Sequence, residues 1–326
     1  MFNTVDMHCD TIMKIYQSKQ QGTAERLRRN TYQIDREKLE KGEYLLQNFA
    51  LFMDMKETDS PYTTCKEMIQ CFHEEMADNQ DWISPVTTYE EILTNQKNGK
   101  ISALLTMEEG APIQGELKKL EEFYKDGVRM ITLTWNYPNE IGYPNAAFFD
   151  EQSKILSVNQ KGLTKQGIAV VQRMEELGMI IDVSHGSDQL VEDVLTYTNK
   201  PFVASHSNAR AVCPHFRNLS DSLIKKIAER GGVIGMNYCD LFITEDGSGS
   251  LIEGLVTHIK HFRDIGGIDC IGLGSDFDGI PVTQELIDAS TVSKLHQALI
   301  QAGFSTQELE KIFYGNVLRL YKEVLR

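Results

Sequence analysis

Short apolar runs alternate with longer amphipathic stretches along the whole chain. The runs are rich in Val, Ile, Leu and Met and end at Gly, Asp, Asn or Ser, which is typical of strands. Between most of them, apolar positions recur every three or four residues, as over 164–178, which predicts helices. Several of these stretches begin with Ser or Thr and end with Gly, as helix caps do. The predicted strands are 4–8, 45–53, 102–108, 128–135, 179–185, 202–206, 232–238 and 270–276.

Strand–helix alternation of this kind predicts a parallel sheet in an α/β fold. Eight repeats favour a closed (β/α)8 TIM-type barrel over an open, doubly wound sheet. No GxGxxG follows the first predicted strand, so a dinucleotide-binding fold has no support. Neither a linker nor a low-complexity tract interrupts the 326 residues. We therefore expect residues 1–326 to form one barrel domain.

Charge and cysteine usage narrow the range of partners. The chain has 33 Lys and Arg against 47 Asp and Glu, a net charge of -14. Such an acidic surface disfavours nucleic acid and anionic membranes as partners. No apolar run is long enough to cross a bilayer, and the first residues lack a signal-peptide pattern. The six cysteines form no CxxC pair, so reduced thiols in a cytoplasmic protein are expected, and a zinc ribbon is excluded.

Three ionisable residues alternate in the first predicted strand. Asp6, His8 and Asp10 occupy every second position and therefore share one face of a strand. A solvated edge strand would explain them simply. A buried cluster that holds a metal ion would also explain them, because buried charges are costly unless they are paired or coordinated.

Similar residues end four more predicted strands. The C-terminal ends of strands meet at one face of a barrel, so these side chains would gather there. A single His or Asp at such a position is usually structural, but five strand ends together indicate a metal site. Imidazole and carboxylate ligands suit zinc, manganese, iron or cobalt. The residues are His8 and Asp10, Glu108 and Glu109, His185, His206, and Asp276 and Asp278.

Such a cluster could hold two ions. Glu108 or Glu109 would bridge them, a shared hydroxide would attack the substrate, and Asp276 or Asp278 would transfer the proton. The remaining histidines lack this placement. His73, His258, His261 and His296 lie in helical stretches and are read as surface or packing residues, whereas the role of His215 stays open.

The motifs that carry these residues resemble, in order and over nearly the whole chain, the renal (membrane) dipeptidase family. These are binuclear zinc peptidases, a branch of the amidohydrolase-like barrels. The resemblance rests on DMHCD (6–10), LLTMEEG (104–110), LTW (133–135), MIIDVSHGS (179–187), FVASHSNARAVCPHFRN (202–218), GVIGMNY (232–238) and GLGSDFDG (272–279).

The resemblance implies two divalent metal ions, with Zn²⁺ as the family's usual metal. His8 and Asp10 would bind the first ion, and His185 and His206 the second. Glu108 would bridge both and so take part in catalysis. The family often has Gly after the bridging Glu, where this chain has a second Glu, and alignment with the motif selects Glu108.

The resemblance also implies substrate contacts. Arg217 would grip the C-terminal carboxylate of a dipeptide, a role for which a planar guanidinium is suited, and Asp276 would be the acid/base. For Arg217, a surface salt bridge is the simpler alternative. At Trp135 this chain departs from the many members that have His, so the indole N–H would have to substitute for it or the metals would polarise the carbonyl alone.

These observations predict a metal-dependent dipeptidase that acts through a metal-bridged hydroxide. Dipeptides with a C-terminal D-residue are further candidate substrates, and the resemblance suggests a homodimer. Two alternatives stay open. One is a related amidohydrolase acting on another amide or a lactone, which would not need Arg217. The other is a catalytically silent barrel that only binds ligands.

Overall fold

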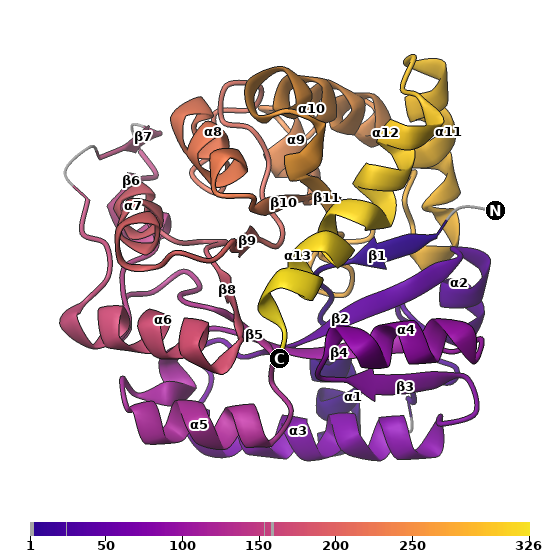
Figure 1. Ribbon diagram of the computed structural model, residues 1–326, viewed down its shortest axis with the longest axis vertical. Helices are drawn as coiled ribbons and strands as arrows, with labels where there is room; N and C mark the ends of the chain where they lie inside the picture. Colours follow the sequence, from indigo (N-terminus) through magenta and orange to yellow (C-terminus); the bar gives the residue numbers. More distant parts are fainter. Residues whose placement is uncertain (1–2, 24, 153, 158–159) are drawn as a thin grey trace.

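A closed barrel of eight parallel strands forms the centre of the computed structural model, which describes residues 3–23, 25–152, 154–157 and 160–326 (Figure 1). Each predicted strand overlaps one barrel strand, so the predicted TIM-type barrel is confirmed. The strands are β1 (Thr4–Asp6), β2 (Tyr44–Phe52), β4 (Ile101–Glu108), β5 (Met130–Thr132), β8 (Ile180–Asp182), β9 (Val203–Ala204), β10 (Val233–Met236) and β11 (Ile271–Leu273).

Pairing of β2 with β4 closes the ring, which runs β2-β1-β11-β10-β9-β8-β5-β4. A further parallel strand, β3 (Ile83–Val86), pairs with the first half of β4 outside this ring. The hydrophobic pattern did not predict β3, because it is short and contains Pro85, and proline removes a donor that a central strand needs. Between β5 and α6 lies a small hairpin of β6 (Phe149–Asp150) and β7 (Ile155–Leu156).

Helices surround the ring and mostly follow the predicted alternation. Serine and threonine caps start many of them; Ser187, for example, accepts a hydrogen bond from the backbone N–H of Leu190. The α-helices are α1 (Thr11–Gln20), α2 (Arg36–Lys41), α3 (Pro61–Asp78), α4 (Tyr89–Lys97), α5 (Leu117–Lys125), α6 (Lys165–Leu177), α7 (Asp188–Tyr197), α8 (Asp221–Glu229), α9 (Asp240–Ile243), α10 (Leu251–Gly266), α11 (Ser293–Gln301), α12 (Thr306–Glu310) and α13 (Asn316–Val324). None of the helices within the described ranges is long and apolar enough to cross a membrane.

The last helix contributes side chains to the interior of the barrel. Figure 1 shows α13, in yellow, lying across the ring of strands. Its Val317, Leu320 and Tyr321 join the buried cluster that contains Val5 and Met7 from the first strand region. The Tyr321 hydroxyl also contacts the Asn48 side chain inside β2. These side chains fill the interior of the barrel, which is therefore a packed core and not a pore. In such a barrel, the functional site lies at the C-terminal ends of the strands.

Candidate metal centre

The C-terminal ends of four barrel strands bring five predicted ligands together. His8 and Asp10 follow β1, Glu108 is the last residue of β4, His185 follows β8, and His206 follows β9. All five side chains are buried. The solvated edge strand considered for the first three ionisable residues is therefore wrong, and the polar face of that strand lies inside the molecule.

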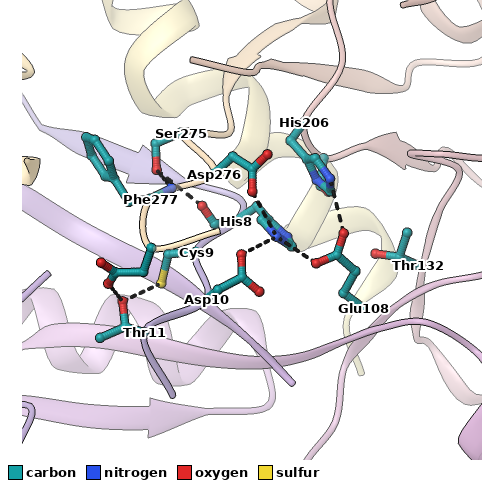
Figure 2. Close-up of polar contacts among 12 residues, drawn as sticks. His8, Cys9, Asp10, Thr11, Glu108, Thr132, His206, Ser275, Asp276 and Phe277 are labelled. Atoms are coloured by element: carbon teal, nitrogen blue, oxygen red, sulfur yellow. Dashed lines mark hydrogen bonds and ion pairs between the residues drawn. The ribbon is translucent and has the colours of Figure 1, made fainter. Parts of the chain in front are cut away.

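Glu108 lies at the middle of this group, and its two oxygens face different histidines (Figure 2). Oε2 is 3.2 Å from Nε2 of His8. Oε1 is 3.0 Å from Nε2 of His185 and 3.4 Å from Nε2 of His206. Asp10 completes the first side, with Oδ2 at 3.3 Å from Nε2 of His8. The geometry is that of one carboxylate shared by two adjoining sets of donors.

The donor sets fit divalent metal ions. Ligand atoms of His8, Asp10 and Glu108 lie within 4.8 Å of one another, and so do those of Glu108, His185 and His206. Oδ1 of Asp10 is buried without a hydrogen-bond partner among the described residues, and Nε2 of His8 has carboxylate oxygens at 3.2 and 3.3 Å but makes no hydrogen bond with them. Buried polar atoms without partners are costly, and bound cations would satisfy them.

The pKa values of the three histidines shift in different directions. Burial lowers the pKa of His8, but the carboxylates of Glu108 and Asp10 outweigh burial and raise it well above its ordinary value. Burial lowers the pKa of His185 to about 4, helped by the charge of Arg217. Burial also holds the pKa of His206 well below its ordinary value. His185 and His206 are therefore neutral near pH 7, which is the form in which imidazole binds metals.

Backbone strain accompanies the site. His185, Asp276 and Asp278 adopt left-handed φ angles of 65°, 64° and 68°. Non-glycine residues pay for this conformation, and it concentrates at functional sites. At these positions the chain leaves its strand by a sharp turn.

Two pairs of acidic residues were candidates for the metal centre, Glu108 with Glu109 and Asp276 with Asp278. In each pair, one side chain faces the centre and the other points away from it. Glu109, with φ of 94°, turns away and accepts hydrogen bonds from the backbone N–H groups of Ala111 and Trp135. Asp278 accepts from the Thr11 hydroxyl at 2.6 Å and from a backbone N–H. Asp276, by contrast, has Oδ1 at 3.7 Å from Nε2 of His8. Only Glu108 and Asp276 of these four face the metal centre.

A cavity of about 410 Å³ adjoins the metal centre, and Arg217 and Trp135 line it. Arg217 is buried, so the surface salt bridge considered for it is wrong. Its Nε and Nη1 have no hydrogen-bond partner among the described residues, so the guanidinium carries unused donors. Trp135 packs edge-on against Phe52 and forms an aromatic wall. His215, whose role the sequence left open, stacks on Phe216 at the same cavity.

Supporting residues were missed by sequence reasoning. The Asn136 side-chain oxygen lies 3.0 Å from Nδ1 of His185. Asn237 donates a hydrogen bond from Nδ2 to Oδ2 of Asp276 over 2.8 Å. His258, in contrast, was predicted as a surface or packing residue; it is buried and accepts a hydrogen bond from the backbone N–H of Ala209. No motif spacing signals such contacts, because each joins segments that are far apart in the chain.

The sequence profile of the membrane dipeptidase family, peptidase family M19, matches residues 1–326. An uncharacterized protein of the pqqA 5′ region of Klebsiella pneumoniae is 36% identical over 232 residues, which cover 70% of this chain and 84% of that protein. Dipeptidase 3 of Mus musculus is 33% identical over 232 residues, which cover 69% of this chain and 45% of that protein. The match thus spans about half of the mouse dipeptidase.

Solved structures share the fold. The dipeptidase AC, a metallopeptidase of family M19, superimposes with a TM-score of 0.89 at 24% identity, with 99% of each chain covered. A metallopeptidase from Rhodobacter sphaeroides, bound to a phosphinate mimic of the dipeptide L-Ala-D-Ala, superimposes with a TM-score of 0.88 at 23% identity and the same coverage.

Proposed function

The chain belongs to the membrane dipeptidase family, peptidase family M19, and on this premise we propose that it is a dipeptidase that uses two divalent metal ions, with Zn²⁺ as the metal. The observation that supports this most strongly is the position of Glu108 between two buried donor sets. His8 and Asp10 would hold one ion, and His185 and His206 the other. When bound, such ions lower the pKa of a shared water and polarise the carbonyl of the substrate.

Arg217 would select the substrate by its C-terminal carboxylate. Arg217 lines the cavity beside the metal centre, and a buried guanidinium with unsatisfied donors favours an anionic partner. This contact would place the carboxylate at a set distance from the donors of His8 and Glu108. A fixed distance between the carboxylate and the metal-binding residues suits a short peptide. The unsatisfied donors of Arg217 therefore favour a dipeptide over a lactone or another neutral amide as the substrate.

Asp276 would move the proton. Burial raises the pKa of its carboxyl above the ordinary value, and the charge of Glu108 adds to the rise. A raised pKa suits a carboxylate that takes a proton and passes it to a departing amine. Asn237 holds the far oxygen, Oδ2, and leaves Oδ1 on the side of His8.

Trp135 would shape the substrate pocket. It lines the cavity, and Phe52 packs against it. We propose that dipeptides with a C-terminal D-residue are also substrates. This is supported by the structural relative from Rhodobacter sphaeroides, which binds a phosphinate mimic of L-Ala-D-Ala.

A substrate panel tests the proposal. Protein stripped with a chelator and then reloaded with Zn²⁺ should hydrolyse L,L- and L,D-dipeptides and leave lactones and dipeptide amides nearly untouched. Hydrolysis of the amides at the same rate as the free dipeptides would reject the carboxylate role of Arg217. Preference for a lactone would favour the alternative amidohydrolase.

A further inference from the structure

A chain of buried side chains leads away from the metal centre behind His206. Nδ1 of His206, the ring nitrogen turned away from Glu108, lies 2.7 Å from the hydroxyl of Ser205. That hydroxyl donates a hydrogen bond to Oδ2 of Asp182 over 2.6 Å. All three side chains are at most 1% exposed. The contacts therefore lie out of reach of solvent that could replace them.

Hydrogen counting assigns the direction of each bond. Asp182 accepts from four donors: the backbone N–H groups of Ser184 and Ser205 at Oδ1, and the hydroxyls of Thr132 and Ser205 at Oδ2. A carboxylate with four donors acts as an acceptor only. The single hydrogen of the Ser205 hydroxyl is thus used, and its oxygen is left to accept, from Nδ1 of His206 at 2.7 Å and from the Ser184 hydroxyl at 3.2 Å.

From this geometry we propose that Asp182, acting through Ser205, is a positioning residue that keeps the hydrogen of His206 on Nδ1 and the lone pair of Nε2 toward Glu108. Imidazoles that bind metals commonly donate their other N–H to a fixed acceptor, which orients the ring and sets its tautomer. The inference rests on the proposed function only in that a metal ion is the partner of Nε2.

Asp6 and Ser275 form a pair that is hydrogen-bonded like Asp182 and Ser205, but no imidazole is attached to it. Asp6 accepts from the backbone N–H groups of His8 and Ser275 at Oδ1, and from the Ser275 hydroxyl at Oδ2. The other contacts of that hydroxyl are with the backbone of His8 and Phe277, and no ring nitrogen is among them. Asp6 and Ser275 thus join β1 to the end of β11 in the way that Asp182 and Ser205 join β8 to the end of β9. They provide a matched control.

The isosteric change Asp182→Asn makes a sharp test. The amide oxygen would face the two backbone N–H groups, so the amide nitrogen would donate to the Ser205 hydroxyl. Ser205 would then donate to Nδ1 of His206 at 2.7 Å, the shorter of its two remaining contacts, since the Ser184 hydroxyl lies 3.2 Å away. This would drive the hydrogen to Nε2, the nitrogen that faces Glu108. Loss of such a support typically lowers metal affinity 10–100-fold.

Two measurements on the full chain decide the inference. Nitrogen NMR of the histidine rings in metal-free protein should show His206 protonated at Nδ1 in the wild type and in Asp6→Asn, but at Nε2 in Asp182→Asn. Titration with Zn²⁺ alone, against a competing chelator, should show affinity about 10–100-fold lower in Asp182→Asn. Should that variant not fold, Ser205→Ala removes the acceptor with a smaller change and should weaken Zn²⁺ binding in the same range.

An unchanged His206 tautomer together with unchanged Zn²⁺ affinity in Asp182→Asn, or in Ser205→Ala where that variant replaces it, would overturn the inference. Neither readout depends on peptide hydrolysis. Wild-type protein that binds Zn²⁺ but cleaves no dipeptide would refute the proposed function and leave the role of Asp182 standing. Protein that shows the expected tautomers but binds no Zn²⁺ would refute the metal centre itself.

Discussion

Nη2 of Arg217 donates a hydrogen bond to the backbone carbonyl oxygen of His206 over 3.0 Å. The residue proposed to anchor the substrate is thus tied to a residue proposed to bind metal. A change in the loop between them would alter both at once. This contact explains how a loop residue can hold a constant distance from the reacting centre, as positioning for catalysis requires.

Replacing Arg217 should cost substrate binding more than chemistry. In Arg217→Met we expect kcat/KM for dipeptides to fall about 10–100-fold, because a hydrogen bond to a charged group contributes about 1.5–3 kcal/mol. Most of the loss should appear in KM. Steady-state kinetics on a dipeptide and on its amide would separate the effects, since the amide lacks the carboxylate and should lose little.

Arg210→Met is the control for that change. Arg210 lies in the same loop but forms a two-point ion pair with Asp188, with both N–O distances at 2.7 Å. Kinetics close to the wild type are expected for it. Equal losses in the two variants, or equal losses on the dipeptide and its amide, would contradict a carboxylate anchor at Arg217.

Asp276→Asn should lower kcat by about 10²–10⁴, the usual contribution of a general acid or base. KM and Zn²⁺ content should change much less. Asp278→Asn is the matched control two residues away, because its carboxylate is committed to Thr11 and to the backbone N–H of Gln33. That control should lower thermal stability and keep most of kcat. The reverse result would assign the proton transfer to Asp278.

Gly279 keeps space for the carboxylates of the site. A Cβ at this position would lie 2.2 Å from Oδ2 of Asp10 and 2.6 Å from Oδ1 of Asp276. Overpacking of this kind costs about 1–3 kcal/mol. Gly279→Ala should therefore weaken Zn²⁺ binding about ten-fold, measured by chelator competition. In Gly315→Ala the nearest atom to the new Cβ would be 3.2 Å away, and Zn²⁺ affinity should not change.

His258 should make stability depend on pH. Its Nδ1 accepts from the backbone N–H of Ala209 and its Nε2 donates to the carbonyl oxygen of Ile243, while burial lowers its pKa from 6.5 to about 4. Because the pKa of His258 is lower in the folded state than in the unfolded state, folding favours its neutral form. The stabilisation that this gives the folded state is complete above pH 6.5 and is lost as the pH falls toward 4. Its upper size is ~3 kcal/mol, from 1.36 kcal/mol per unit.

Denaturant unfolding at several pH values measures this effect. Between pH 6.5 and 4 the free energy of unfolding should fall more steeply in the wild type than in His258→Gln. Parallel curves for the two proteins would show that His258 is not responsible. The difference between the curves is the relevant quantity, because His185 and His215 also have a lowered pKa and act in the same direction.

The sequence alone predicted the barrel and the gathering of strand-end residues, for a physical reason. Parallel strands that close a ring bring their C-terminal ends to one face, so the position of His8, Glu108, His185 and His206 along the chain already implies their proximity. The choice between Glu108 and Glu109 depends on more than alternation. The left-handed turn at Glu109 directs that side chain to backbone donors, while Glu108 faces the histidines.

Contacts between neighbouring strands could not be predicted. The link from Asp182 through Ser205 to His206 depends on how β8 and β9 pair, where Asp182 lies opposite Val203. A change of one residue in that register would remove the link and leave every motif intact. The same holds for Asn136 beside His185, since its loop has no periodic pattern.

The rate of dipeptide hydrolysis against equivalents of Zn²⁺ added to metal-free protein tests the proposed two-metal dipeptidase most directly. We expect no hydrolysis in metal-free protein and a rise that levels off at two ions per chain. Glu108→Gln should abolish the rise, since Glu108 joins the two donor sets. Undiminished hydrolysis in metal-free protein, or none at any loading with Zn²⁺, would show that the chain is not a dipeptidase of this kind.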